Sequence, residues 1–277
     1  MTRFDAIVIG AGVNGLIAGA MLARRGKSVC LLEQRADPGG MATLDEGDGP
    51  ALAHLLYNLS PTVLREIGLN PAALPFRTTP LATVSLSDEG HHAVLRDQSI
   101  TRPEGTAHPD AAAALALITR LTAYGALLRH LAEAPPPGGD TPLAVQLWHL
   151  RHMGLSARRL GRAEMRHLLR ILLSNAHDLI RDEMPDGPLA GLLAADAVRG
   201  AAAGPRSPGT VFNLIYRMGH GGAVHLPTGG MGAVIAAIAG AARAAGCQIE
   251  TGTQVSRILI ENDAACGVET REGTTLH

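Results

Sequence analysis

The sequence has 277 residues, of which 46% are hydrophobic, 18% are charged and only 3% are aromatic. This composition is typical of a folded globular protein, and its many alanines and glycines predict helices that pack closely. The formal net charge of -1 gives no reason to expect a nucleic-acid partner. Because Cys30, Cys247 and Cys266 form no C-x-x-C pair, we expect buried free thiols and a cytoplasmic protein.

The first residues carry a strand–helix–strand pattern. Residues 4–10 form a short apolar run with several β-branched side chains, which predicts a buried parallel strand. Residues 12–25 predict a helix that ends in two arginines before Gly26, and residues 28–33 predict a second strand. The apolar run 6–23 also has the length of a signal peptide or short membrane span, but its spaced glycines favour the strand and helix.

A glycine fingerprint lies between the first strand and the helix, namely Gly10-Ala11-Gly12-Val13-Asn14-Gly15. In a dinucleotide-binding unit the first glycine permits a tight turn, the second admits a pyrophosphate, and the third lets the helix pack on the sheet. Glu33 ends the second strand, where a carboxylate can accept both ribose hydroxyls of an adenosine. An acid at this position disfavours NADP. The pattern therefore predicts an adenine dinucleotide site.

The rest of the chain alternates between helical and α/β patterns. Residues 51–69 predict a helix, and residues 110–200 predict several more, with a Pro/Gly break at 135–139. A second glycine motif then leads into a helix and a series of short strands, predicted at 229–232, 233–245, 247–250, 254–261, 266–270 and from 274. We therefore expect an α/β Rossmann-like FAD/NAD(P)-binding domain of the layered, glutathione-reductase-like type. It comprises 1–75 and 215–277, with a mainly helical insertion or substrate domain at 76–214.

FAD and NAD share an adenosine half, so the fingerprint alone does not separate them. Three features favour FAD: the fingerprint opens the chain, Pro38-Gly39-Gly40 closely follows Glu33, and the sheet resumes only after the helical insertion. An NAD-dependent dehydrogenase remains as an alternative.

Residues 6–43 resemble the FAD-binding N-terminus of the amine oxidase and phytoene desaturase flavoproteins, through Glu33-Gln34-Arg35 and Pro38-Gly39-Gly40-Met41-Ala42-Thr43. Within that group the whole chain is most similar to the branch of phytoene desaturase-like and carotenoid isomerase-like oxidoreductases that includes pyridine nucleotide-disulfide oxidoreductase domain-containing protein 2. Further shared segments are 59–61, 65–69, 193–200, 207–209 and 229–232.

This resemblance implies roles for particular residues. It places the phosphates at the fingerprint glycines with Val13 and Asn14, and the ribose at Glu33. Gln34 and Arg35 then lie near the adenosine, Gly39 and Gly40 near the pyrophosphate and flavin, and the backbone of Val255 beside the adenine. Met41 stands where many relatives carry arginine, and no catalytic residue is assigned.

The resemblance also implies a reaction, which is hydride transfer to FAD from a C–H bond of a small apolar substrate such as an isoprenoid or polyene. Members of the family are about twice as long as this chain. The alternative is therefore a non-catalytic fragment or split subunit that needs a C-terminal partner chain.

Several weaker signals favour structural roles. His149 and His152 have a helical metal-ligand spacing but no third ligand, so no metal is expected. The arginine-rich segment 151–170 is favoured as a solvated helix face, with membrane-surface contact as the alternative. Four residues in segments that could approach the flavin are interpreted as structural, namely His54, Tyr57, Arg217 and His220.

Overall fold

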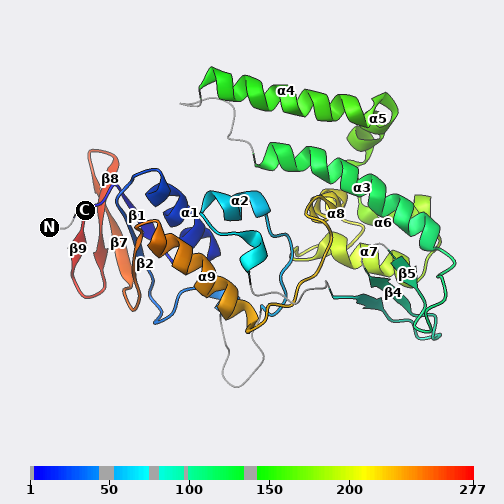
Figure 1. The fold of residues 1–277 in the computed structure, drawn as a ribbon, viewed down its shortest axis with the longest axis horizontal. Coiled ribbons are helices and arrows are strands. Elements are labelled where there is room, and N and C mark those ends of the chain that lie inside the picture. Colours follow the sequence, from blue (N-terminus) through cyan, green and yellow to red (C-terminus); the bar gives the residue numbers. More distant parts are fainter. Residues whose placement is uncertain (1–2, 44–52, 75–80, 97–98, 134–141) are drawn as a thin grey trace. The chain divides into compact units, whose positions relative to one another are not determined.

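The computed structural model describes residues 3–43, 53–74, 81–96, 99–133 and 142–277. The chain divides into two compact units, one formed by residues 1–79 and 225–277 (unit 1) and the other by residues 80–224 (unit 2). The elements of both units are labelled in Figure 1.

Unit 1 is built around a three-stranded parallel sheet with the strand order β1-β2-β6. Its helices and the strands of this sheet are β1 (Ala6–Ile9), α1 (Val13–Arg24), β2 (Val29–Leu32), α2 (Pro61–Glu66), α9 (Gly230–Ala244) and β6 (Gln248–Glu250). Short 3-10 turns occupy Gly40–Thr43 and Pro71–Ala73. An antiparallel meander follows, consisting of β7 (Val255–Glu261), β8 (Ala264–Thr270) and β9 (Thr275–Leu276).

The sheet of unit 1 is covered on both faces, and β2 shows why. All four residues of β2 are buried. Val29 and Leu31 belong to the core that includes α1 and α9, whereas Cys30 and Leu32 belong to a second core with residues of β8 and β9. A strand buried on both faces needs apolar residues at every position, which accounts for the unbroken apolar run in the sequence. The α/β prediction is confirmed, and the run 6–23 forms β1 and α1.

The helix predicted over 51–69 is wrong for most of its length. Residues 51–52 lie outside the described residues, 53–60 are not helical, and α2 begins only at Pro61. The Ser60 side chain accepts a hydrogen bond from the Val63 N–H and caps the helix. Ser60 also precedes Pro61, and the helical conformation is disfavoured for a residue that precedes a proline. Leu56 instead exchanges two backbone hydrogen bonds with His225.

Unit 2 is mainly helical. Its helices are α3 (Ala111–Ala132), α4 (Leu143–Leu160), α5 (Arg162–Ile171), α6 (Ala176–Glu183), α7 (Pro188–Val198) and α8 (Thr210–Gly219). It also contains an antiparallel sheet that the sequence analysis did not predict, formed by β3 (Thr83–Ser85), β4 (Ala93–Arg96) and β5 (Ser99–Thr101). The Pro/Gly break at 135–139 lies outside the described residues.

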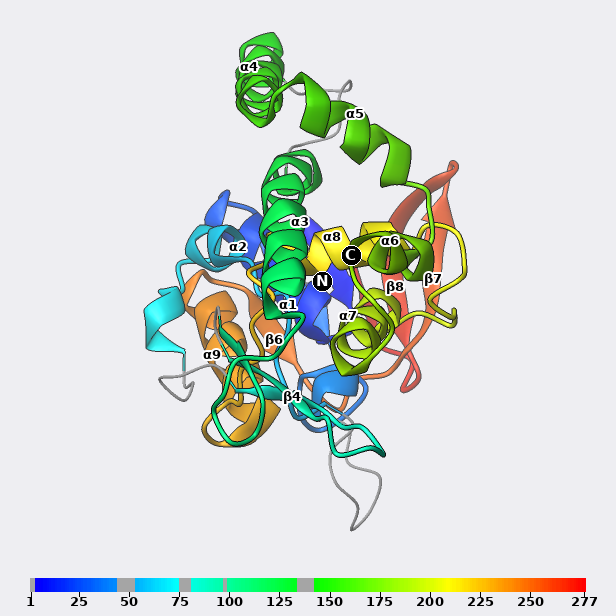
Figure 2. The ribbon, with the colours of Figure 1, turned by 90° about the vertical axis from the view of Figure 1, so that its right-hand side faces the viewer.

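Helix α3 forms the centre of unit 2 and lies beside α8 (Figure 2). Residues 111–129 are long and apolar enough to cross a membrane by length and composition. However, Leu117, Leu121 and Tyr124 are fully buried within the core that α3 shares with α6, α7 and α8. In the described structure α3 is therefore the core helix of a folded unit.

The chain passes from unit 1 to unit 2 between residues 79 and 80 and returns to unit 1 between residues 224 and 225. The expected boundaries were 75/76 and 214/215. The expected second boundary would cut through α8, whose residues Val211, Leu214, Ile215 and Met218 are buried in the core of unit 2. The α/β pattern in the sequence resumes with α9, but the chain remains in unit 2 until Val224.

Two glycines allow α3 and α8 to approach closely. A Cβ atom added to Gly125 would overlap the backbone of Gly219, and one added to Gly219 would lie 2.7 Å from the carbonyl oxygen of Gly125. The backbones therefore touch where the helices cross. This contact confirms at one position the close helix packing that the composition predicts.

We predict that Gly125→Ala lowers the stability of unit 2 by about 1–3 kcal/mol, because both helix backbones must move apart. Gly191→Ala in α7 is the matched control, since a Cβ there meets no atom within 4 Å. Removing a glycine from a helix interior should stabilise unit 2 by about 0.5–1 kcal/mol. Urea unfolding followed by circular dichroism measures both, and equal effects of the two variants would contradict the contact.

Candidate dinucleotide site

The glycine fingerprint forms the turn between β1 and α1. Gly10 has φ +97°, a left-handed backbone that other residues rarely adopt. Gly12 is the N-cap of α1, and no side chain caps the start of this helix. A Cβ added to Gly12 would meet no atom within 4 Å, so its front is open space. The turn therefore presents bare backbone and the positive end of α1 to the outside.

Gly15 has a different task from Gly12. A Cβ at Gly15 would overlap the carbonyl oxygen of Gly10, and one turn later a Cβ at Gly19 would lie 3.0 Å from the Cys247 sulfur. Both positions are closed by the protein itself. Gly15 and Gly19 thus let α1 pack against the turn and against the residue before β6, while Gly10 and Gly12 face open space.

Glu33 is buried, with 5% of its surface exposed, and its carboxylate joins two backbone segments. Oε2 accepts a hydrogen bond from the Ala11 N–H at 2.7 Å, and Oε1 accepts one from the Arg35 N–H at 2.9 Å. The sequence analysis assigned both oxygens to a ribose and missed this bracing role. Because an ionised carboxylate has about four acceptor sites, each oxygen retains one for a ligand.

The double-glycine loop lies directly against the fingerprint. The Gly39 N–H donates to the Ala11 carbonyl at 2.8 Å, and a Cβ at Gly40 would lie 3.3 Å from the Cα of Gly12. The Arg35 guanidinium donates to the Gly40 carbonyl at 3.1 Å. The side chain of the adjacent residue, Met41, is 77% exposed. Two glycine segments far apart in sequence thus form one surface that is free of side chains.

A pocket at the end of the sheet brings further predicted residues together. The carbonyl of Glu33 accepts a hydrogen bond from the Thr253 N–H at 2.8 Å, which ties the end of β2 to the segment before β7. The pocket is lined by Ile9, Gly10, Leu32, Glu33, Gln34, Thr253, Gln254 and Val255. Val255 and Glu33 therefore line the same pocket. Val13 and Asn14 occupy the first turn of α1, with the Asn14 side chain exposed.

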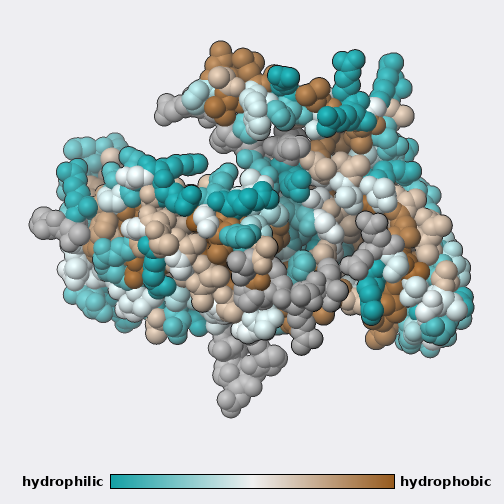
Figure 3. All heavy atoms as spheres, viewed as in Figure 1, coloured by the Kyte–Doolittle hydropathy of each residue, from teal (hydrophilic) through white to brown (hydrophobic). Residues whose placement is uncertain are grey.

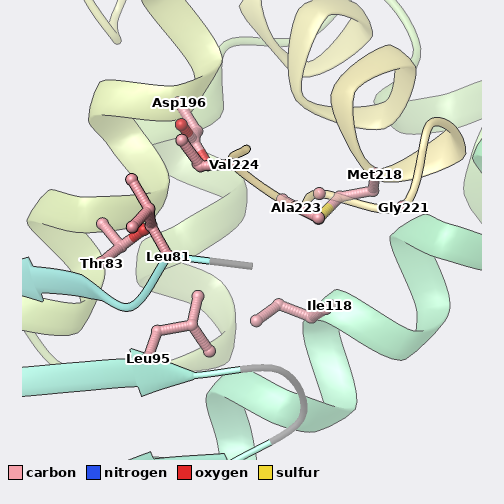
Figure 4. Close-up of a pocket in the computed structure, with 10 residues that line it drawn as sticks. Leu81, Thr83, Leu95, Ile118, Asp196, Met218, Gly221, Ala223 and Val224 are labelled. Carbon is pink, nitrogen blue, oxygen red and sulfur yellow. The ribbon is translucent and has the colours of Figure 1, made fainter. Parts of the chain in front are cut away.

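Unit 2 contains a separate pocket of about 250 Å³ that the sequence analysis did not predict (Figure 4). Leu81, Leu95 and Ile118 project into it, and Asp196 lies at its wall beside Val224. The full lining is Leu81, Thr83, Leu95, Ile118, Asp196, Met218, Gly221, Gly222, Ala223 and Val224. The lining is mostly apolar, with one acidic side chain.

Asp196 is nearly buried and lies between two arginines. It pairs with Arg199 at 2.7 Å and with the Arg217 Nε at 3.5 Å. Arg217, which is 3% exposed, also donates to the carbonyls of Gly222 and Ala223 at 2.6 and 3.1 Å. Arg217 therefore fixes the loop that forms one wall of the pocket. An acid inside the apolar helix sequence LLAADAV is the signal that could have identified this position.

The other weak candidates have local contacts. His220 stacks on Tyr216 with the ring centroids 4.5 Å apart, and its Nδ1 lies 2.9 Å from the Tyr216 carbonyl. His152 stacks on Trp148 in the same way. Within the described ranges, no group of three or more His, Cys, Asp or Glu side chains is placed to hold a metal ion.

Comparison with known proteins extends the geometry to a family. A family model described as FAD dependent oxidoreductase matches residues 5–277. Pyridine nucleotide-disulfide oxidoreductase domain-containing protein 2 of Rattus norvegicus is 26% identical over 294 residues, which cover 94% of this chain and 49% of that protein. Chloroplastic prolycopene isomerase of Daucus carota is 24% identical over 291 residues, covering 99% of this chain and 45% of that protein.

A solved structure shares the fold. A putrescine oxidase with bound putrescine matches 99% of this chain and 56% of its own, with a TM-score of 0.55 and 18% sequence identity. The chain spans about half the length of the curated relatives it matches. The comparisons confirm the predicted α/β fold and FAD as the cofactor of the family.

We predict that Glu33→Gln lowers the stability of unit 1 by about 1–3 kcal/mol, because its amide group cannot accept from both buried N–H groups. The amides of Ala11 and Arg35 should exchange hydrogen faster than in the wild type, which peptide-resolved exchange measures. Glu261→Gln, at an exposed end of β7, is the control and should change stability by less than about 0.5 kcal/mol. Unchanged exchange at Ala11 would show that the brace is absent.

Proposed function

The chain belongs to the FAD dependent oxidoreductase family, and from this premise we propose that unit 1 holds the adenine dinucleotide part of FAD. We further propose that the protein removes a hydride from a C–H bond of an apolar substrate. One observation carries the proposal: Gly10, Glu33, Gln34 and Val255, which come from three separate segments, line one pocket at the fingerprint turn.

The glycine surface fits a pyrophosphate. Gly12 has open space where a side chain would stand, and Gly40 lies next to it. The uncapped start of α1 offers N–H donors and a partial positive charge, with Val13 and Asn14 in its first turn. A phosphate at this position would accept hydrogen bonds from these donors. The double glycine is therefore proposed to contact the same group from the other side.

The neighbouring pocket fits an adenosine. Each oxygen of Glu33 keeps one acceptor site for a ribose hydroxyl, and Gln34 lies beside it in the lining. The backbone at Val255 is proposed to border the adenine. The Arg35 guanidinium donates a hydrogen bond to the Gly40 carbonyl, so we propose that Arg35 holds the double-glycine loop in place. The absence of a cation from this pocket lining agrees with a ribose that carries no 2′-phosphate.

When bound, FAD supplies the hydride-accepting chemistry, and the protein contributes orientation and a dry site. The pocket in unit 2 is our candidate for substrate binding because leucine, isoleucine, methionine and valine supply five of its ten lining residues. The 24% sequence identity to prolycopene isomerase agrees with a polyene or isoprenoid substrate. We propose the phytoene desaturase-like branch on the same grounds.

A second candidate function is that of a subunit that needs a polypeptide partner. In the described part of the chain, β1 pairs only with β2, and its other edge has no strand beside it. Ile9, Ile258 and Ile260 are exposed, and the first two line a groove between β1 and β8. An open strand edge presents unpaired backbone donors and acceptors, so this edge fits an added strand.

We predict that the purified chain becomes yellow on reconstitution with FAD, and that Gly12→Ala weakens FAD binding about ten- to a hundredfold while the protein stays folded. The new methyl group would occupy space reserved for the ligand. Gly15→Ala is the contrasting variant and should lower stability, because its methyl group meets the Gly10 carbonyl. Fluorescence titration with FAD and circular dichroism separate the two effects.

Three results distinguish the candidates. Unchanged affinity in Gly12→Ala would reject the proposed phosphate site. A wild-type chain that binds FAD only after addition of the C-terminal half of a relative would favour the second candidate. A folded chain that stays colourless with FAD, both alone and with the C-terminal half of a relative, would reject both candidate functions.

For the substrate, we predict that anaerobic mixing of the FAD-loaded protein with a polyene or isoprenoid alcohol bleaches the visible flavin absorbance, whereas putrescine does not. The leucine, isoleucine and methionine side chains of the unit 2 pocket should accept the former. The one acid in the lining, Asp196, is already paired with Arg199 and Arg217, so a diamine would be poorly solvated there. Leu95→Asp should abolish bleaching and leave the flavin spectrum unchanged. Bleaching by putrescine alone would overturn the apolar assignment.

A further inference from the structure

Helices α4 and α5 carry a group of large apolar side chains that the core of unit 2 does not cover. No residue of α4 is buried. We call the outward surface of these two helices the α4–α5 face. Its exposed apolar residues are Leu143, Val145, Leu147, Trp148, Leu150, Leu155 and Leu169, and Leu173 lies just after α5. Exposed apolar groups of this size usually mark an interaction surface.

The apolar residues of α4 fall into two groups along the helix. Met153, Ala157 and Leu160 pack against the core of unit 2. Leu143, Leu147 and Leu150 follow the i, i+4, i+7 pattern of a single stripe, and they remain exposed. The stripe continues the packed side of α4 toward the N-terminal end of the helix, where the core no longer covers it. Figure 3 shows hydrophobic residues gathered on this helix beside strongly hydrophilic ones.

The charges of the face are almost all positive. Between residues 142 and 173 the only acid is Glu164, which accepts a hydrogen bond from the buried Tyr124 hydroxyl and also faces Arg120. The arginines, all exposed, are Arg151, Arg158, Arg159, Arg162, Arg166 and Arg170. Among the described residues, none of these six forms an ion pair within 4.0 Å. The face thus combines leucines, a tryptophan and six available cations.

We propose that the α4–α5 face docks on an anionic lipid bilayer. Leucine and tryptophan side chains enter the boundary between headgroups and acyl chains, and arginines bind lipid phosphates. A second copy of the chain is a poorer occupant, because symmetric docking would bring six arginines against six others. A nucleic acid would match the charges but would leave the apolar stripe in water. This proposal does not depend on the bound cofactor or the reaction.

The chain contains one tryptophan, Trp148, and it lies on this face with 56% of its surface exposed. Its fluorescence therefore reports on docking without any added label. We expect the full chain to sediment with vesicles of phosphatidylcholine containing about 30% phosphatidylserine, and its emission to shift to shorter wavelength. Vesicles of phosphatidylcholine alone should bind at least tenfold more weakly. Salt near 1 M should release the protein, because it screens charges within about 3 Å.

Paired variants separate the apolar and the charged contributions. Arg158→Gln combined with Arg159→Gln should lower vesicle binding roughly thirtyfold, since each arginine near an anionic surface contributes about fivefold. Leu147→Gln combined with Leu150→Gln should abolish the emission shift. Leu86→Gln and Arg96→Gln are the controls, because both residues are exposed in unit 2 outside the α4–α5 face. The controls should bind as the wild type does.

Three results would overturn the proposal. One is a folded chain that neither sediments with anionic vesicles nor changes its Trp148 emission. Another is emission that is already shifted without lipid in a dimeric protein, which would assign the face to a second copy. The last is equal loss of binding in the control variants, which would show attraction by overall charge rather than by this face.

Discussion

The geometry of unit 1 depends on the two hydrogen bonds that the Glu33 carboxylate accepts from backbone N–H groups. One bond holds Ala11, the residue between the first two fingerprint glycines, and the other holds Arg35. The Ala11 carbonyl in turn accepts from Gly39, so the same short segment positions the double-glycine loop. A buried carboxylate without partners would be strongly unfavourable, and these bonds satisfy it before any ligand arrives. The turn is therefore already formed for a dinucleotide.

Local signals predicted the strand–helix–strand unit around the fingerprint well, and long-range packing explains what they missed. The strand, helix and strand of residues 4–33 were predicted to within two residues, because each ends at a glycine or a change of periodicity. The helix at 51–69 failed because Leu56 pairs with His225, a contact no local pattern reveals. The bracing role of Glu33 was missed for a similar reason. Its partner Ala11 is 22 residues away, and the sequence identifies the acid but not what it bonds to in the absence of ligand.

Unit 2 solves a different packing problem with the same small residues. With few aromatic side chains available, α3 and α8 bring their backbones together at Gly125 and Gly219. The Met218 side chain then lines the pocket, and Arg217 donates a hydrogen bond to the Gly222 carbonyl and holds that loop. Because Asp196 fixes Arg217 in turn, the pocket wall depends on a buried ion pair. Its shape is therefore set by polar contacts, although leucine, isoleucine, methionine and valine supply half of its lining residues.

The β1 edge and the α4–α5 face differ in the partners that their chemistry suits. Among the described residues no strand pairs with the outer edge of β1, and its groove is lined by Asp5 and His277 without an arginine or lysine. Backbone donors and acceptors beside isoleucine side chains are matched by another strand. The α4–α5 face has no free backbone edge, since helices satisfy their own hydrogen bonds, but it carries six arginines. Cations beside leucines are matched by phosphates above hydrocarbon, so a polypeptide suits the first surface and a bilayer the second.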